Sequence, residues 1–322
     1  MLSRHFLRCK VLQVAYAYRL DLNDNASDAV RTLEYNIGKL NELGVLQVSM
    51  LTKMVEVAAK VMEEGKQKFR PTEEELNPNT KLLGNEFLRR LADNFEFKKH
   101  VADWCGCWDT HENLIREAFL DFKKQKVYLD YLAKESSSYE EDKELAIMMF
   151  RYLVNRDSLV AVMGERSLLW EDDFHQIAQY NYMMLKTLNE ADFDEAMLWP
   201  LMYDQRVEKE QEDIDFAKSL IRHTLEGRVE SEELIKRYLK GWEFERVSLM
   251  DILLIDMAVA ELTKCPSIPE RVTVDEYIEL SKEYSSERSK LFINGILDKL
   301  VSELRSQGKI NKWGRGISEE EN

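Results

Sequence analysis

The segment from His100 to His111, "HVADWCGCWDTH", places two histidines and two cysteines close together. Imidazole nitrogen and thiolate sulfur are ligands that Zn²⁺ prefers, so a zinc site is the first chemistry to consider. A closed zinc site needs ligands that converge tetrahedrally, usually from paired short loops. On a continuous helix Cys105 points away from Cys107, and the flanking tryptophans favour a packed core in which the thiols act as small hydrophobic groups. We therefore expect no metal and no cofactor.

Motifs of the common enzyme classes are absent from the sequence. It contains no P-loop, no G-x-G-x-x-G after a strand, no G-x-S-x-G and no H-E-x-x-H. The five histidines are spread along the chain, and the many carboxylates are typical of solvated helix faces. We expect no catalytic residues and no enzymatic activity.

The first twenty residues, "MLSRHFLRCKVLQVAYAYRL", contain basic residues and no acidic one. This composition is also that of a mitochondrial transit peptide. However, apolar residues recur at i, i+4, i+7 and i+11 from Leu7, which is the stripe of a helix that packs on a core. We therefore favour a structural helix over a transit peptide. The basic residues on one flank of its stripe are Arg4, His5, Arg8 and Arg19, with Lys10 on the other flank.

A second basic segment begins the last helical pattern, near Ser286. Arg288, Lys290 and Phe292 fall in or near its first two turns, where free backbone N–H groups attract phosphate. Cations beside an aromatic ring suit single-stranded RNA. If this helix packs beside the N-terminal helix, the two form one basic strip with an aromatic platform. The alternative is that Arg4 and Arg8 pair with acidic neighbours and that Phe292 is core.

Gly295 lies inside the same helical pattern, although a glycine there costs about 1 kcal/mol relative to alanine. We interpret it as a point where another helix backbone approaches closely. Such an approach would fix the orientation of Phe292 and Asn294.

Length, composition and charge limit the remaining possibilities. The chain has 322 residues, only 12 glycines and 5 prolines, and apolar residues every three or four positions, so we expect it to be nearly all helix. A formal charge of −15 repels phosphate and confines any nucleic-acid site to a local surface. Four cysteines suit a reducing cytosol, and no apolar run reaches the roughly 18 residues that span a membrane. These features predict a soluble, cytoplasmic protein.

Several elements can be delimited from capping and breaking residues. We expect a helix over 26–66, a loop over 68–84, a new helix capped by Ser138 and a buried central helix over 250–264. Thr273 and Glu276 have the spacing of a capping box, and Ser285 or Ser286 caps the last helix.

The stretch from Trp242 to Leu300 closely resembles the C-terminal core of the NusB family of transcription antitermination factors. The likeness rests on A-x-x-E-L at Ala258–Leu262, on P-x-x-V-x-[IV]-[ND]-E-x-[IV]-E-[LI] at Pro269–Leu280 and on S-x-x-F-[IV]-N-G-[IV]-L-D-K at Ser289–Lys299. The N-terminal "RCKVLQVAYAY" resembles the first helix of the family, with its Q-x-x-Y. Residues 25 to 210 take no function from the resemblance.

The resemblance implies an all-α fold of two packed helical bundles, here with a large additional helical region. On this basis we assign residues 1–211 to an N-terminal helical region and 212–305 to a NusB-like RNA-binding core. Residues 306–322 are predicted to be a disordered tail.

The resemblance also implies a function without catalysis. Family members bind boxA RNA of ribosomal RNA leaders together with the ribosomal protein NusE, in the transcription elongation complex. The positions that match RNA-binding residues of the family are Arg4, His5, Arg8, Lys10, Tyr16, Tyr238, Arg288, Lys290 and Phe292, and Asp251 matches an acidic residue near the NusE contact. Phe6 and Leu7 interrupt the basic stretch, so the alternative is a helical protein-interaction scaffold whose RNA surface has decayed.

Overall fold

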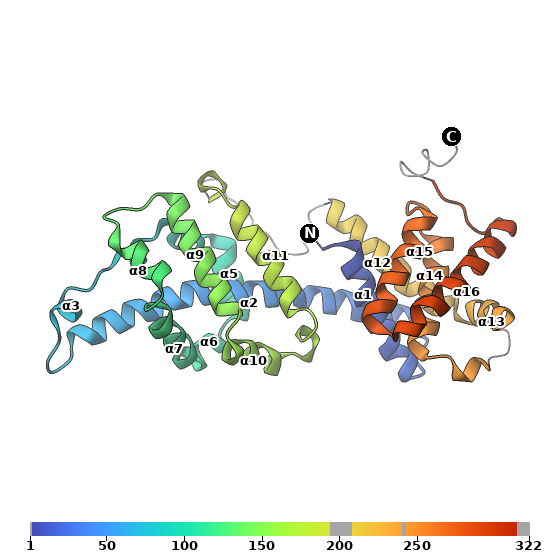
Figure 1. The fold of residues 1–322 in the computed structure, drawn as a ribbon, viewed down its shortest axis with the longest axis horizontal. Coiled ribbons are helices and arrows are strands. Elements are labelled where there is room, and N and C mark those ends of the chain that lie inside the picture. The colour runs from blue at the N-terminus through green and yellow to red at the C-terminus, as the bar shows by residue number, and fades with distance from the viewer. Residues whose placement is uncertain (1, 194–207, 240–242, 314–322) are drawn as a thin grey trace. The chain divides into compact units, whose positions relative to one another are not determined.

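The protein is described by a computed structural model that covers residues 2–193, 208–239 and 243–313. Every regular element in these ranges is a helix, which confirms the predicted all-α fold. The chain divides into two compact units: unit 1 comprises residues 1–37 and 203–322, and unit 2 comprises residues 38–202 (Figure 1). Within the described ranges, no helix combines the length and apolarity that crossing a membrane requires.

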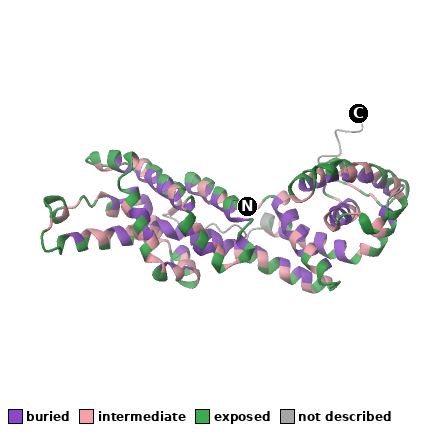
Figure 2. Cartoon of the chain, turned by 60° about the horizontal axis from the view of Figure 1, so that its bottom comes forward, coloured by how far each residue is buried: buried purple, intermediate pink, exposed green. Residues whose placement is uncertain are grey.

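Unit 1 is built around helix α14, Leu249–Lys264, which packs against α1, α12, α13, α15 and α16. The sequence of α14 is apolar nearly all round, and residues 251–258 are all buried, so the prediction of a central helix is confirmed. Figure 2 shows the buried residues on the inward faces of the surrounding helices. These helices are α1 (Arg4–Leu20), the start of α2 (Ala26–Lys66), α12 (Glu208–Glu226), α13 (Arg228–Tyr238), η4 (Phe244–Arg246), α15 (Glu270–Tyr284) and α16 (Glu287–Ser306).

Side-chain caps fix where the two outer helices of unit 1 begin. Ser3 Oγ accepts a hydrogen bond from the backbone N–H of Phe6 at 3.1 Å and starts α1. Ser286 Oγ accepts from the N–H of Ser289 at 3.3 Å and starts α16, as predicted. Each bond satisfies one N–H group that has no partner within the helix.

The start of α15 differs from the prediction. The helix begins at Glu270, directly after Pro269, so Thr273 and Glu276 lie inside it and the predicted capping box is wrong. The Thr273 hydroxyl instead donates to the buried carboxylate of Glu261 at 3.0 Å. The fixed φ of Pro269 favours the start of a helix at the next residue. The buried carboxylate of Glu261 needs a hydrogen-bond donor, and the Thr273 hydroxyl supplies one.

Unit 2 is organised around the part of α2 that follows Ile37. Residues 40–51 are all buried, so the polar side chains of this stretch need internal partners. Gln47 Nε2 donates to the carbonyl of Phe174 at 3.0 Å, and Asn181 Nδ2 donates to Gln47 Oε1 at 3.0 Å. The other helices are α3 (Glu73–Leu76), η1 (Lys81–Gly84), α4 (Glu86–Asp93), α5 (Phe95–Trp104), α6 (Cys107–Thr110), α7 (Glu112–Phe122), α8 (Lys126–Ala133), α9 (Tyr139–Val154), α10 (Asp157–Arg166), η2 (Leu168–Trp170), α11 (Phe174–Thr187) and η3 (Glu190–Phe193).

The sequence-based boundaries of unit 2 are largely reproduced. Helix α2 spans the predicted residues 26–66, and Ser138 caps α9 through a capping box with Glu141. The predicted loop over 68–84 contains two short helical turns, α3 and η1.

Residues 307–313, which belong to the predicted tail, continue unit 1 and contact the end of α14 and the turn after it. Lys312 Nζ donates to the carbonyls of Glu261 and Cys265, each at 3.0 Å, and the N–H of Trp313 donates to the carbonyl of Pro266 at 3.0 Å. The remainder of the predicted tail, 314–322, lies outside the described residues.

Candidate nucleic-acid interface

Arg8 is an internal residue of unit 1 rather than a surface cation. Its guanidinium forms a two-pronged pair with Glu261, with Nε and Nη2 at 2.8 and 2.7 Å from the carboxylate oxygens. The side chain of Arg8 is 2% exposed and that of Glu261 is fully buried. The expectation that Arg8 lies on an exposed basic flank is therefore wrong, and the alternative that it pairs with an acidic neighbour is confirmed.

Further donors surround the same carboxylate. The hydroxyls of Thr273 and Tyr277 each donate to Glu261 at 3.0 Å. Burial alone would lower the pKa of the Arg8 guanidinium, but its hydrogen bonds to Glu261 and the charge of that carboxylate raise the pKa above its ordinary value. The pair is thus a charged, fully bonded connection between α1, α14 and α15.

The other basic residues near the start of α1 also have internal partners. Arg4 Nε donates to Asp213 at 2.8 Å, and its guanidinium lies 5.4 Å from the ring centroid of Phe216. Lys10 is buried, and its ammonium donates to Gln13 at 2.8 Å. Arg4 keeps a 37% exposed side chain and remains the most accessible cation of the three.

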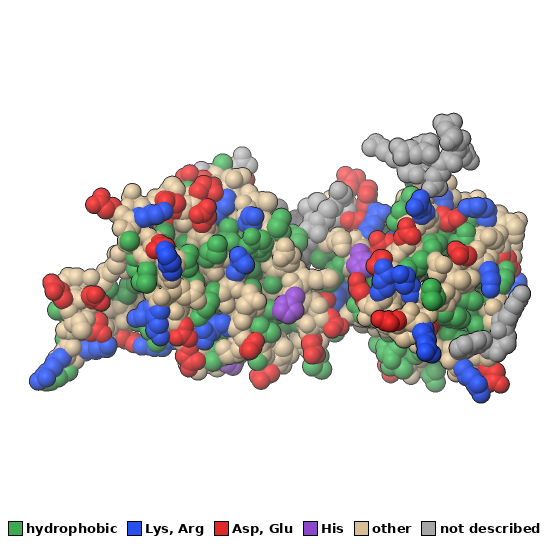
Figure 3. All heavy atoms as spheres, in the orientation of Figure 1, with side chains coloured by type: hydrophobic (Ala, Val, Ile, Leu, Met, Phe, Trp, Pro, Cys, Tyr) green, Lys and Arg blue, Asp and Glu red, His purple; other side chains and the backbone are tan. Residues whose placement is uncertain are grey.

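The α1–α15 edge, defined here as Arg4, His5, Glu276, Glu279 and Glu283, brings distant parts of the sequence together. His5 lies 2.9 Å from Glu276 and 3.2 Å from Glu283. A hydrogen bond from Lys282 lowers the pKa of Glu279, and the charges of Lys290 and His5 act in the same direction. The start of α1 and the first turn of α16 therefore meet at α15, where carboxylates offset their charges. Figure 3 shows the same mixture of basic and acidic side chains over α15 and α16.

Helix α16 separates two residues that the sequence analysis grouped. Lys290 and Phe292 are two positions apart, which rotates their side chains by about 200° around a helix. Lys290 acts on Glu279 of α15, whereas Phe292 lies on the opposite flank, partly buried against the core of unit 1. Arg288 is exposed, and its side chain has neither a hydrogen bond nor an ion pair to any residue that the structure describes.

On the second flank of α16 a cation lies beside an aromatic ring of α13, and a similar pair joins α13 to η4. Tyr238, at the end of α13, donates its hydroxyl proton to Glu303 at 2.8 Å, and this bond raises the pKa of the tyrosine. Lys299 Nζ lies 5.8 Å from the Tyr238 ring centroid, and Lys236 Nζ lies 4.6 Å from that of Phe244. These distances are within the range of cation–π attraction.

Gly295 lies on this flank, between Phe292 and Lys299, because positions 292, 295 and 299 share one face of a helix. A Cβ placed on Gly295 would have no neighbouring atom within 4 Å. The predicted close approach of a second backbone is thus wrong, and the helix backbone is open at this point. We name this surface, made of Tyr238, Phe292, Gly295 and Lys299, the α13–α16 face.

Two further predicted site residues are not free at the surface. Tyr16 is partly buried and packs against the core of unit 1. Asp251 is buried and accepts hydrogen bonds from the hydroxyls of Ser285 at 2.6 Å and Ser289 at 2.9 Å. Asp251 therefore fixes the start of α16 and does not offer its carboxylate to a partner protein.

Part of the chain is similar to known proteins. The pattern of the NusB family matches residues 175–302. The transcription antitermination protein NusB of Salinibacter ruber is 43% identical over 103 residues, which are 32% of this chain and 64% of that protein. Residues 175–302 of the chain belong to the NusB family. A solved structure of T. maritima NusB is 32% identical and covers 41% of this chain and 76% of its own, with a TM-score of 0.28.

The present chain spans 64% of the length of its Salinibacter relative, and the match to the NusB family includes α14, α15 and most of α16. Sequence reasoning missed Lys299 as a candidate site residue, and it also missed the contact of Lys236 with Phe244. A signal for Lys299 was present, because it ends the NusB-like motif that contains Phe292 and follows that phenylalanine by two helical turns. The ring of Phe244 could not be assigned to Lys236 without the fold.

The segment from His100 to His111 provides no convergent ligands. The His100 ring stacks on Trp104 with centroids 4.7 Å apart, and His111 Nδ1 lies 2.9 Å from the carbonyl of Cys107. Burial raises the pKa of the Cys105 thiol to about 12, which disfavours the thiolate that a metal requires. The arrangement fits the interpretation of this segment as packed core.

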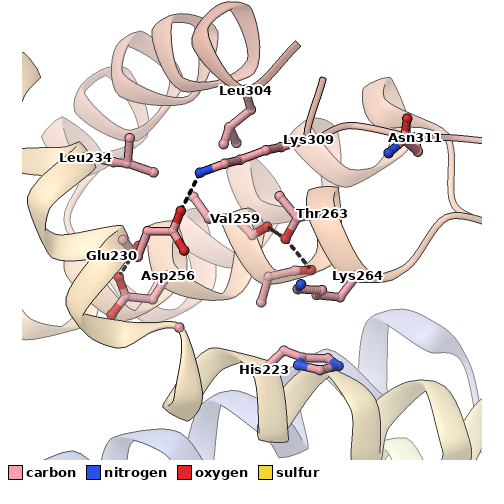
Figure 4. A pocket seen from close by; sticks show the side chains of 13 residues that line it. His223, Glu230, Leu234, Asp256, Val259, Thr263, Lys264, Leu304, Lys309 and Asn311 are labelled. Carbon is pink, nitrogen blue, oxygen red and sulfur yellow. Dashed lines mark hydrogen bonds and ion pairs between the residues drawn. The ribbon is translucent and has the colours of Figure 1, made fainter. Parts of the chain in front are cut away.

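A cavity of about 330 Å³ in unit 1 lies between α12, α13, α14 and the segment after α16. Figure 4 shows Lys309 ion-paired with Glu230 across it, and Asp256 and His223 among its lining side chains. No phenylalanine, tyrosine or tryptophan from the described ranges lines this cavity, so it offers no stacking platform for a base.

Proposed function

We propose that this NusB-family chain is an RNA-binding transcription antitermination factor and that the α13–α16 face binds single-stranded RNA. Membership of the family and the name of the Salinibacter relative support the process. The observation that carries the site is the placement of Lys299 of α16 beside the ring of Tyr238 at the end of α13.

The chemistry of the face suits an unpaired strand. Aromatic side chains stack on bases with about 1–3 kcal/mol per base, while lysines contact the phosphates. Gly295 leaves the backbone of α16 open between Phe292 and Lys299, so a nucleotide can approach the helix without meeting a side chain. The exposed Arg288 lies one turn before Phe292 and extends the cationic path.

The finer features of the proposal come from the resemblance. We propose a boxA-like element of ribosomal RNA leaders as the RNA and the ribosomal protein NusE as the partner, within the elongation complex and without a catalytic step. In this scheme Arg4 of the α1–α15 edge adds a weaker contact, together with Lys290 of α16, whose charge acts on Glu279 of that edge. Asp251 contributes indirectly, because its bonds to Ser285 and Ser289 position the start of α16.

The test measures the affinity of the full chain for a boxA-like oligonucleotide by fluorescence anisotropy at several salt concentrations. Arg288→Glu combined with Lys299→Glu should weaken binding and reduce the salt slope by about 1.4, because each lost phosphate contact contributes about 0.7 for single strands. Arg271→Glu is the control, since Arg271 is 80% exposed on α15 and belongs to neither surface. A matching thermal unfolding curve shows that the double variant is folded.

A helical interaction scaffold is the second candidate, and the carboxylates that offset Arg4, His5 and Arg8 favour it. It predicts the same affinity and the same salt slope for the double variant, the control and the parent chain. That result would refute the RNA site on the α13–α16 face.

A further inference from the structure

His5, Cys9 and Glu283 place three different metal-ligating groups around one point of unit 1. His5 and Cys9 are one turn apart on α1, and Glu283 belongs to the last turns of α15. One ligand atom from each residue, an imidazole nitrogen, the thiol sulfur and a carboxylate oxygen, lies within 4.8 Å of the other two. This is the only such group of three among the residues that the structure describes.

The separation of the His5 and Glu283 ligand atoms is close to that in a tetrahedral zinc site. His5 Nε2 and Glu283 Oε1 are 3.2 Å apart. In a zinc site with bonds of about 2.0–2.2 Å, a nitrogen and an oxygen ligand lie about 3.3 Å from each other. Cys9 is buried and the Glu283 side chain is 51% exposed, so the three groups lie at the edge between the core and the surface of unit 1.

A second carboxylate orients the imidazole. His5 Nδ1 lies 2.9 Å from Glu276 Oε2, and ligating histidines commonly donate their other N–H to a carboxylate in this way. A neutral imidazole carries only one N–H. If Nδ1 donates to Glu276, then the lone pair of Nε2 faces an oxygen of Glu283, and a cation or a second proton must lie between them.

We propose that His5 Nε2, Cys9 Sγ and Glu283 Oε1 bind Zn²⁺. The mixture of nitrogen, sulfur and oxygen ligands is that of zinc rather than of Mg²⁺ or Ca²⁺, which select oxygen alone. Zinc binding releases the thiol proton, so a thiolate and a carboxylate balance the two positive charges of the ion. The ion ties the first turns of α1 to the end of α15, and it uses no residue of the α13–α16 face.

The test titrates the full, metal-stripped chain with Co²⁺ as a spectroscopic probe and then displaces the probe with Zn²⁺. We expect one Co²⁺ per chain and a sulfur-to-cobalt charge-transfer band that Cys9→Ser abolishes. The control Cys265→Ser should keep the band, because Cys265 is a buried thiol of the same unit outside the proposed site.

Glu283→Gln keeps the proposal falsifiable if Cys9→Ser fails to fold, since Glu283 is exposed. It should lower the affinity for Co²⁺ and Zn²⁺ at least tenfold, whereas Glu279→Gln on the same helix should leave both unchanged. Glu276→Gln should reduce the affinity about 10- to 100-fold through the orientation of His5. A missing band in the parent chain, a band that persists in Cys9→Ser or an unchanged affinity in Glu283→Gln would overturn the proposal and leave a second proton on His5 as the explanation.

Discussion

The basic residues of unit 1 fall into two regions that differ in what surrounds the charge. Along α1, Arg8 and Arg19 point inward to the carboxylates of Glu261 and Asp256 of α14. On the α13–α16 face, Lys299 is exposed and lies beside the ring of Tyr238. The arginines of α1 stabilise the fold, and their charges are already paired with carboxylates of the protein. The α13–α16 face combines an exposed charge with an aromatic surface on which a base can stack. The surroundings of a cation, and not its presence in the sequence, decide whether it can bind RNA.

Arg8→Met should produce the largest effect and sharpen this comparison. It leaves the buried carboxylate of Glu261 without its counter-charge, so we expect a loss of about 3–5 kcal/mol in the free energy of unfolding. Arg4→Met removes a partly exposed ion pair and should cost at most about 1 kcal/mol. Urea unfolding followed by circular dichroism measures both. Equal losses in the two variants would show that Arg8 is not an internal residue.

The pH dependence of stability tests the other inward pair. Burial raises the pKa of Asp256 to about 7, although a hydrogen bond from Ser231 and the charge of Arg19 act in the opposite direction. An acid whose pKa is higher in the folded state stabilises the protein at low pH and loses that contribution as the pH rises through the folded value. Between pH 4 and 7 the contribution of Asp256 to the free energy of unfolding should therefore fall by about 1.4 kcal/mol per pH unit.

The measurement compares the parent chain with Asp256→Asn, which cannot titrate. The stability difference between the two should shift steadily in favour of the variant from pH 5 to pH 7. A difference that does not change with pH would mean that Asp256 is already ionised in the folded protein at pH 5.

Tyr238 tests the outer region without changing its charge. Tyr238→Ala removes a stacking surface worth about 1–3 kcal/mol, which corresponds to a roughly 5- to 150-fold weaker RNA affinity. Tyr238→Phe keeps the ring and loses only the bond to Glu303, so it should bind RNA as the parent chain does. Similar losses in both variants would assign the role to the hydroxyl and contradict stacking.

Gly295→Ala should give the smallest effect, and we expect it to increase the stability of the protein. Because a Cβ at this position meets no neighbour, the substitution should stabilise α16 by up to about 1 kcal/mol. Thermal unfolding measures the change. A loss of stability would restore the interpretation of Gly295 as a point of tight helix packing.

Much of the fold could be predicted from periodicity and capping residues. The bounds of α2, the cap of α9 at Ser138 and the buried α14 all follow from local sequence signals. The partners of α1 could not be predicted, because Glu261 is 253 residues from Arg8 and nothing local links them. Thr273 was misread for the same reason, since its hydroxyl serves that distant carboxylate. One part of the α13–α16 face could be predicted, because Phe292 and Lys299 belong to one sequence motif and are spaced to share a helix face.

The ammonium of Lys312 has a consequence for anyone who shortens this chain. It donates to the carbonyl of Glu261 in the last turn of α14 and to that of Cys265, which directly follows the helix. Residues after Ser306 look dispensable from sequence, and trimming them is the usual first step toward better crystals. Here a stop codon at that point would uncap the central helix and expose the end of the bundle, so a shortened protein should keep the chain at least through Trp313.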